Sequence, residues 1–383
     1  MRISYHTFGC RLNRAETLQE QAEAICSGHE VVEDDSSADV IVVRACSVTA
    51  RAEKDCRKFI NRLKENYPKS EVRVVGCLPG MPRKTKEEKV SLPSKAPSST
   101  ARAYLKVQDG CGGKCTFCIV PQFRGESVSV PLSAVKKLAE QFAEIGYYEF
   151  VVTGCNLSMY KSEGVGLGGL IDTLAKEYGD KRVRLSSYEP CICDDELLDA
   201  FVENKNICRF LHVSLQSASD YVLERMKRPY NSAEIDEFIS SFRKRLGNYA
   251  MLGCDVICGF PGEREEDFKA TREFLERHNF VNVHAFPYSE RPGTPAAEMA
   301  DVVLRDVRHE RVRILLDDAA KRKERFFESF VGKEVEVCVE KSGEESRGWS
   351  SEYIPCVIKK NVPRKTLYKG IVKEMTSGEL IID

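Results

Sequence analysis

The stretch DGCGGKCTFC, residues 109–118, decides how the chain around it is interpreted. It carries three cysteines, Cys111, Cys115 and Cys118. A disulfide takes two thiols and a closed structural zinc site takes four ligands, so a group of three fits neither. Iron–sulfur clusters are held by cysteine thiolates, and a 4Fe-4S cube held by three of them leaves one iron open to a small molecule. The glycines in this stretch would let the backbone wrap closely around such a cube.

The cysteine stretch lies near the start of a long alternation of strands and helices, residues 104–327. The candidate strands are YLKVQD, EFVVTG, RVRLSS, FLHVSLQ, MLGCDVICGF and NVHAFPYS. Six β/α units predict an open or partial barrel with its active site at the carboxyl ends of the strands. The cysteine stretch follows the first strand and therefore belongs to that edge. The last helix, near residues 305–327, carries a row of arginines opposite its apolar face, which predicts a solvated face or, less simply, phosphate contacts.

The first 80 residues also alternate between strand and helix, which predicts a doubly wound parallel α/β domain. Cys10, Cys46 and Cys77 each stand just past a predicted strand. Because the carboxyl ends of parallel strands meet at one crevice, these distant thiols are expected to lie together. From the residues alone, a metal site and three buried cysteines that happen to end strands both remain open.

Two further segments complete the chain. Residues 81–103 are polar and rich in proline, serine and lysine, the composition of a linker. Residues 328–383 contain short strands separated by turns, which predicts a small, OB-like β-barrel. Trp349 and Tyr353 in this part could stack on nucleic-acid bases or fill the barrel core.

Composition sets the expected setting. The chain has 383 residues, a net charge of −1, and no apolar run long enough to span a membrane. Its start lacks the pattern of a signal peptide, which predicts a cytoplasmic protein. In a reducing compartment, 16 cysteines favour metal ligands, reactive thiols or buried side chains over disulfides. The ten outside the two trios are expected to be mostly core residues: Cys26, Cys56, Cys155, Cys191, Cys193, Cys208, Cys254, Cys258, Cys338 and Cys356.

The spacing of Cys111, Cys115 and Cys118, with Phe117 before the last, resembles the signature of the radical S-adenosylmethionine (SAM) superfamily. Further segments resemble its methylthiotransferases, which replace a C–H bond with C–SCH3. These segments are FGCRLN, ACSVTARA, VGC, SSYEP, HVSLQSASDYVLERMKRPY, DVICGFPGE, FPYSERPGTPA and, in the C-terminal part, the TRAM-like GWSSEYIPCVI. The resemblance covers nearly the whole chain, in the same order.

The resemblance implies two 4Fe-4S clusters and SAM. One cluster, on Cys111, Cys115 and Cys118, would cleave SAM, and an auxiliary cluster would be held by Cys10, Cys46 and Cys77. The chain departs from the family in two places: Arg44-Ala45 precedes the second auxiliary cysteine where Asn-Thr is usual, and the segment after Cys77 is short.

The resemblance also implies individual contacts. SAM contacts are expected at Phe117, Gly154, Ser187, Glu189, Ser214, Gln216, Ile257 and Gly259. RNA contacts are expected at Arg124, Lys227, Arg228, Trp349 and Tyr353, with Arg124 also able to stabilise charge on a cluster.

The sequence Gly9-Cys10-Arg11-Leu12-Asn13 is most similar to the subfamily that acts on N6-threonylcarbamoyladenosine beside the tRNA anticodon. Methylthiolation of isopentenyladenosine in tRNA or of a ribosomal protein are the alternatives within the family. A non-catalytic RNA-binding protein with structural zinc is the alternative of another class. The expected partners are tRNA and an electron donor such as flavodoxin or ferredoxin, without a membrane, and the oligomeric state is left open.

Overall fold

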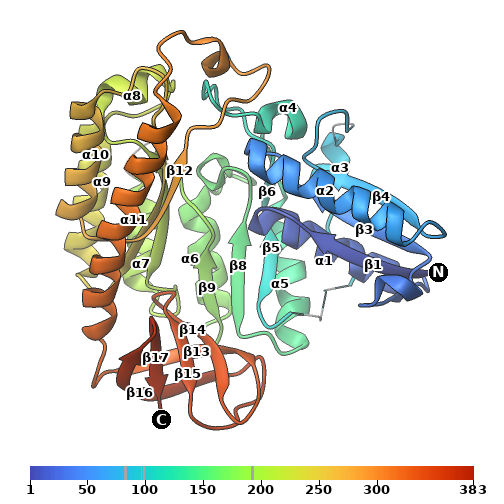
Figure 1. The fold of residues 1–383 in the computed structure, drawn as a ribbon. Coiled ribbons are helices and arrows are strands. Elements are labelled where there is room, and N and C mark those ends of the chain that lie inside the picture. The colour runs from blue at the N-terminus through green and yellow to red at the C-terminus, as the bar shows by residue number, and fades with distance from the viewer. Residues whose placement is uncertain (82–83, 96, 98–99, 191–193) are drawn as a thin grey trace.

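The computed structural model describes residues 1–81, 84–95, 97, 100–190 and 194–383. Its α/β N-terminal domain, a larger central part and a small all-β part follow one another along the chain (Figure 1). None of the described helices is both long enough and apolar enough to cross a membrane.

The N-terminal domain is built on a parallel four-stranded sheet in the order β2-β1-β3-β4. The strands are β1 (Arg2–Thr7), β2 (Glu30–Val31), β3 (Val40–Ala45) and β4 (Glu71–Gly76), and the main helices are α1 (Arg11–Cys26) and α2 (Ala50–Asn66). Every residue of β3 is buried, as expected for a β-branched strand covered on both faces. The predicted parallel α/β fold is confirmed.

The polar segment after this domain contains ordered structure. It forms a short helix, α3 (Lys86–Val90), which begins with a capping box between Thr85 and Glu88. Lys84 forms an ion pair with Glu16 of α1, and Lys89 donates a hydrogen bond to the carbonyl of Glu126. These contacts tie the described part of the segment to the domains on either side.

The central part contains six parallel strands in two three-stranded sheets, β5-β8-β9 and β10-β11-β12. They are β5 (Ala103–Lys106), β8 (Glu149–Thr153), β9 (Arg182–Leu185), β10 (Phe210–Gln216), β11 (Met251–Cys258) and β12 (Phe280–Pro287). An isolated parallel bridge between Tyr188 and Val213 joins the sheets near their carboxyl ends. The covering helices are α5 (Leu132–Glu144), α6 (Leu167–Glu177), α7 (Asp195–Glu203), α8 (Asp220–Arg225), α9 (Ser232–Leu246) and α10 (Glu265–Arg277). This arrangement confirms the predicted partial barrel.

The cysteine stretch leaves the barrel through a small hairpin of β6 (Gln108–Asp109) and β7 (Val128–Ser129), with α4 (Val120–Arg124) between them. Gly110, at the start of the loop, has φ +74°, and a Cβ there would lie 2.0 Å from the carbonyl oxygen of Glu126. Only glycine fits this crossing, so the hairpin fixes where the loop begins.

The last central helix, α11 (Arg305–Glu328), packs against β12. The expectation that its arginines are solvated is wrong for Arg308, Arg311 and Arg322, which are buried. Arg322 donates a hydrogen bond from Nε to the carbonyl oxygen of Phe280 at 2.7 Å. Long side chains on this helix therefore reach back under the barrel rather than out to solvent.

The C-terminal part is a closed five-stranded barrel in the order β13-β14-β15-β17-β16, which confirms the predicted small β-barrel. Its strands are β13 (Glu334–Lys341), β14 (Ser346–Ser350), β15 (Pro355–Ile358), β16 (Leu367–Thr376) and β17 (Glu379–Ile382). Figure 1 shows this barrel below the ends of β8 and β9. Glu149 at the start of β8 is fully buried and pairs with Arg182 and Arg184, which donate to the carbonyls of Trp349 and Ser350. A buried charge cluster thus joins the barrel to the central part.

Candidate active site

Cys46 and Cys77 directly follow β3 and β4, and Cys10 stands three residues after β1; the three strands are neighbours in one parallel sheet. The fold therefore brings the three thiols to the same sheet edge, as the sequence predicts. The pKa of the Cys46 thiol is raised to about 11, mainly by burial and in smaller part by the nearby Cys10 and Cys77. Thiols must lose their protons to bind a metal, so a metal bound at this edge would have to displace three protons.

The two residues that depart from the family pattern leave this edge intact. The Arg44 side chain turns away from the thiols toward α1, where it pairs with Glu16 at 3.0 Å and Glu20 at 2.7 Å. The carbonyl oxygen of Ala45 accepts hydrogen bonds from the Asn13 amide and from the Cys77 N–H. The substitution therefore changes what lies behind the strand and not the thiol group itself.

Cys111, Cys115 and Cys118 form the second thiol group. The N–H of Gly113 donates to Cys111 Sγ at 3.3 Å, and Arg228 Nη1 donates to Cys115 Sγ at 3.0 Å. Burial raises the pKa of the Cys118 thiol to about 12, and the two other thiols add to the rise. N–H donors directed at sulfur are the contacts that thiolates of a cluster accept.

Arg124 and Arg228, both expected to contact RNA, have buried side chains beside the thiol groups. The Arg124 side chain is 7% exposed, donates from Nε to Cys77 Sγ at 3.1 Å, and pairs with Glu16 and Asp109. The Arg228 side chain is 5% exposed and pairs with Glu189 as well as contacting Cys115. Each guanidinium serves one thiol group from the interior, which fits the alternative expectation for Arg124. Lys227, also expected to contact RNA, is exposed.

The acidic partners of Arg124 are themselves unusual. Burial by itself would raise the pKa of Glu16, but Arg124 and Lys106 hold that pKa well below its ordinary value. The same two cations lower the pKa of Asp109. Glu16 lies on α1 of the N-terminal domain, whereas Lys106 and Asp109 belong to the central part. This buried ion network fixes one thiol-bearing domain against the other.

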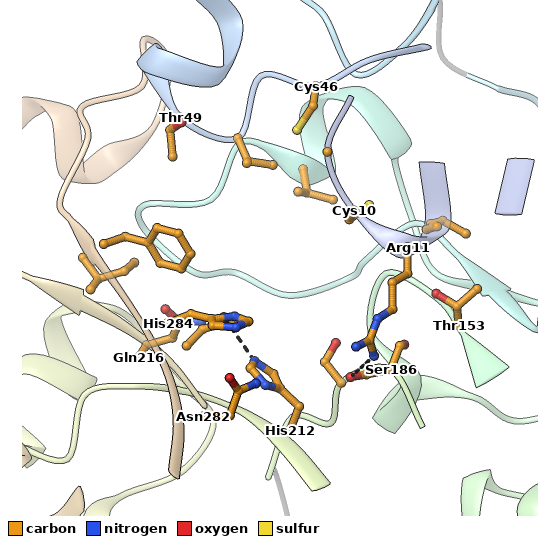
Figure 2. Close-up of a pocket in the computed structure, with 18 of the residues that line it drawn as sticks. Cys10, Arg11, Cys46, Thr49, Thr153, Ser186, His212, Gln216, Asn282 and His284 are labelled. Carbon is orange, nitrogen blue, oxygen red and sulfur yellow. Dashed lines mark hydrogen bonds and ion pairs between the residues drawn. The ribbon is translucent and has the colours of Figure 1, made fainter. Parts of the chain in front are cut away.

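A cavity of about 970 Å³ lies between these groups, and Cys10, Cys46 and Cys118 all contribute to its wall. Figure 2 shows Cys10 and Cys46 on one side and the strand ends of the central part on the other. Five of the residues expected to contact SAM line it: Phe117, Gly154, Ser187, Gln216 and Ile257. Gln216 has φ +63°, a strained backbone conformation of the kind that concentrates at functional sites.

The three other residues expected near SAM have structural contacts nearby. Glu189 accepts a hydrogen bond from Asn156 and pairs with Arg228, and the Ser214 carbonyl accepts from Arg228 at 3.0 Å. Gly259 has φ +71°, and a Cβ there would lie 2.3 Å from the Arg308 side chain. These positions support the cavity wall without lining it.

The aromatic residues expected to stack on RNA also reach the cavity. Trp349 and Tyr353 of the C-terminal part contribute to the cavity wall. Their rings are stacked at 4.5 Å, and Tyr353 also stacks on Phe210 at 4.9 Å. Tyr353 is thus engaged by protein partners on the barrel side.

Three cavity residues were not singled out by the sequence analysis: His212 in β10, Asp255 in β11 and His284 in β12. Asp255 Oδ1 lies 3.1 Å from His212 Nε2 and 3.3 Å from His284 Nδ1. Although burial raises it, hydrogen bonds from the two histidines hold the pKa of Asp255 below its usual value. Two imidazoles and a carboxylate in this arrangement could also hold a divalent cation. Polar residues inside otherwise apolar strands were the available signal.

The other cysteines behave mostly as expected. Those that are buried among the described residues are Cys56, Cys208, Cys254, Cys258, Cys338 and Cys356. Cys26 is exposed, and Cys155 is partly buried with Sγ 3.8 Å from Asp109 Oδ1. Cys191 and Cys193 lie outside the described residues.

Comparison with known proteins places these features in context. Residues 105–275 match the model of the radical SAM superfamily, and residues 2–93 match uncharacterized protein family UPF0004. The chain is 33% identical to a threonylcarbamoyladenosine tRNA methylthiotransferase of Aquifex aeolicus, over 92% of this chain and 96% of the relative. The corresponding protein of Bacillus subtilis is 31% identical, over 93% and 90%.

A further relative is named for a different substrate. A tRNA-2-methylthio-N(6)-dimethylallyladenosine synthase of Erythrobacter litoralis is 30% identical, over 90% of this chain and 87% of the relative. Among solved structures, the radical SAM methyltransferase TsrM of Kitasatospora setae has a similar fold, with a TM-score of 0.55, 13% identity and 77% coverage of each chain.

Proposed function

Since this chain belongs to the radical SAM tRNA methylthiotransferases, we propose that it adds a methylthio group to C2 of N6-threonylcarbamoyladenosine beside the tRNA anticodon. Two relatives of 33% and 31% identity that are named for this substrate support the choice. The sequence Gly9-Cys10-Arg11-Leu12-Asn13 supports it as well. Because those relatives are enzymes by name, a non-catalytic zinc protein is set aside.

One observation carries the proposal: cysteines of both thiol groups line the same cavity. A methylthio transfer needs a site that activates the substrate C–H bond and a site that supplies sulfur, both within reach of one base. Holding these groups around a single cavity converts separate encounters into one bound geometry.

We assign one 4Fe-4S cluster to Cys111, Cys115 and Cys118 and a second to Cys10, Cys46 and Cys77. The donor sets fit, because each offers three close thiols with an arginine N–H directed at one sulfur. When bound, the first cluster supplies the electron that cleaves the SAM sulfonium, and the second supplies a place for the sulfur to be transferred.

The overall change replaces one C–H bond with one C–S bond and one S–CH3 bond. Two SAM molecules are consumed: one is cleaved to methionine and an adenosyl group that takes up the hydrogen as 5′-deoxyadenosine, and the other gives its methyl group to the sulfur and leaves as S-adenosylhomocysteine. The sulfur comes from sulfide, and the electrons come from a donor protein of the flavodoxin or ferredoxin class. This donor, like a cytoplasmic location, is part of the proposal.

The chain's own residues bind and orient SAM and the RNA. Phe117, Gly154, Ser187, Gln216 and Ile257 are assigned to SAM because they line the cavity beside Cys118. Glu189, Ser214 and Gly259 support this wall. Trp349 and Tyr353 close the far end of the cavity and exclude water there, while Lys227 offers a surface charge to RNA phosphates.

Anaerobic reconstitution tests the cluster assignment. The wild type is expected to bind about eight iron atoms and eight sulfides per chain, and a Cys10/Cys46/Cys77→Ala variant about four of each. That variant should still cleave SAM under reductant while forming no methylthio product. Equal iron in both proteins would refute the second cluster.

Nucleoside mass spectrometry tests the substrate. A deletion strain should lose 2-methylthio-N6-threonylcarbamoyladenosine from its tRNA and regain it with the wild-type chain. Loss of the dimethylallyl-type methylthio nucleoside, or of a ribosomal-protein modification, would replace the proposed substrate with one of the family's alternatives.

A further inference from the structure

Arg11 joins all three parts of the chain at the cavity. It is the first residue of α1 and follows Cys10. Its Nη1 donates a hydrogen bond to the carbonyl oxygen of Ser186 at 3.0 Å, and its guanidinium carbon lies 5.1 Å from the ring centre of Tyr353. Figure 2 shows the side chain pointing from the loop of Cys10 toward Ser186. Arg11 is thus held in a defined place on the cavity wall.

Arg11 forms no ion pair with any Asp or Glu in the described parts of the chain. This sets it apart from Arg44, Arg124 and Arg228, which all have carboxylate partners around the thiol groups. Arg11 is only partly exposed. A partly buried cation whose described partners include no carboxylate keeps its charge uncompensated, so the arrangement favours an anion supplied by a ligand. A guanidinium offers five N–H donors in a fork that matches a carboxylate.

The wall around Arg11 is polar as well. Ser186, His212 and Asn282 all line the cavity, and Figure 2 shows them on the same side as the Arg11 guanidinium. Hydroxyl and amide groups here suit a substituent that carries its own donors and acceptors. An apolar prenyl chain would offer no partner to the Ser186 hydroxyl, which has none among the described residues.

We propose that Arg11 binds the carboxylate of the amino-acid group attached to N6 of the substrate adenosine. The inference rests on the proposed function and adds the residue that selects for a charged N6 group. A threonylcarbamoyl group ends in a free carboxylate, whereas the dimethylallyl group named for other relatives carries no charge. Arg11 then acts through a bidentate pair that only the charged substrate completes.

The test uses two anticodon stem-loop RNAs that differ at one group. One carries N6-threonylcarbamoyladenosine, and the other carries the same nucleoside with its carboxylate converted to a neutral amide. Affinity is measured with the reconstituted enzyme, together with kcat and KM for methylthiolation. The wild type should bind the carboxylate RNA about 10- to 100-fold more tightly than the amide RNA, because hydrogen bonds to charged groups are the strong ones.

Arg11→Gln should lose this preference. Its affinity for the carboxylate RNA should fall, while its affinity for the amide RNA should stay within about threefold of wild type. Arg11→Lys should keep part of it, since it retains the charge without the fork. Arg14→Gln is the matched control: Arg14 lies on the same helix, is exposed, and contacts the Tyr104 ring outside the cavity. It should behave like the wild type.

Two results would overturn the inference. One is an unchanged preference in Arg11→Gln. The other is an equal loss for both RNAs with a raised KM for SAM, which would assign Arg11 to the carboxylate of SAM instead. Failure of the proposed function is distinct: the wild type, with full iron content, would then methylthiolate neither RNA.

Discussion

Gly9 shows how little freedom a single residue has beside the candidate auxiliary cluster. Its φ is +94°, and a Cβ would lie 2.6 Å from Cys46 Cβ and 2.7 Å from Cys46 Sγ. The glycine therefore lets two thiol-bearing loops touch. Arg124 and Arg228 show the opposite case, in which a long charged side chain is buried to serve a cysteine sulfur. The sequence did not indicate that either arginine is buried, because burial of a charge depends on partners far away in the chain.

A Gly9→Ala variant should bind about four iron atoms fewer than the wild type, since the added methyl group displaces Cys46 from the other two thiols. SAM cleavage without RNA should persist, because the second thiol group is separate. Gly28→Ala is the control: Gly28 has a similar φ of +79° but nothing within 4 Å of the added atom. Iron analysis of the three reconstituted proteins checks this, and full iron content in Gly9→Ala would contradict it.

At the level of elements, the strands and their order along the chain follow from the hydrophobic pattern, and all six predicted barrel strands are found. The helix α11 is less transparent. Its arginines recur at helical spacing, but Arg308, Arg311 and Arg322 are buried while Arg313 and Arg325 are exposed. A helix pattern gives the face of each residue but not how far a neighbouring strand extends over that face. Arginine is also amphipathic, so its stem can pack while its head bonds a carbonyl.

Arg322→Ala should lower the free energy of unfolding by about 2–4 kcal/mol. The loss includes the packing of a side chain that is 1% exposed and the hydrogen bond to the carbonyl oxygen of Phe280. Arg313→Ala on the same helix should leave stability unchanged, because Arg313 is exposed and pairs only with surface carboxylates. Urea unfolding of both variants measures the difference. Equal stabilities would show that the buried Arg322 side chain does not contribute to the free energy of unfolding.

Across the whole molecule, the thiol groups, the cavity and the C-terminal barrel depend on how the parts dock. The ion network of Glu16, Lys106, Asp109 and Arg124 fixes the N-terminal domain, and the cluster around Glu149 fixes the barrel. Both are buried, so each charge depends on the others for its compensation. Docking therefore determines whether one cavity can reach both thiol groups.

Glu149→Gln should destabilise the docked barrel by about 3–5 kcal/mol, because it leaves Arg182 and Arg184 buried without their carboxylate. Burial by itself would raise the pKa of Glu149, but these arginines hold that pKa below its ordinary value. The carboxylate's contribution is therefore complete above the unfolded pKa of about 4 and is lost only as the pH falls through the lower folded pKa. The difference in barrel stability between variant and wild type should stay constant from pH 8 to pH 5.

Hydrogen exchange of the barrel amides at both pH values measures this gap. Lys176→Gln is a suitable control, since Lys176 forms only exposed pairs with Asp172 and Glu203. A gap that closes already between pH 8 and pH 5 would mean that Glu149 titrates near neutrality and is not held ionised by the two arginines.

The sequence by itself determined the parallel domain, the partial barrel, the closed C-terminal barrel and the two cysteine trios, because strand periodicity and cysteine spacing are local properties of the chain. It also placed Cys10, Cys46 and Cys77 at one edge, since parallel strands end together. Only the tertiary structure decided what surrounds the thiols. The burial of Arg124 and Arg228, the group of His212, Asp255 and His284, and the position of Arg11 on the cavity wall arise from contacts between distant segments. Those contacts depend on docking, which no local pattern encodes.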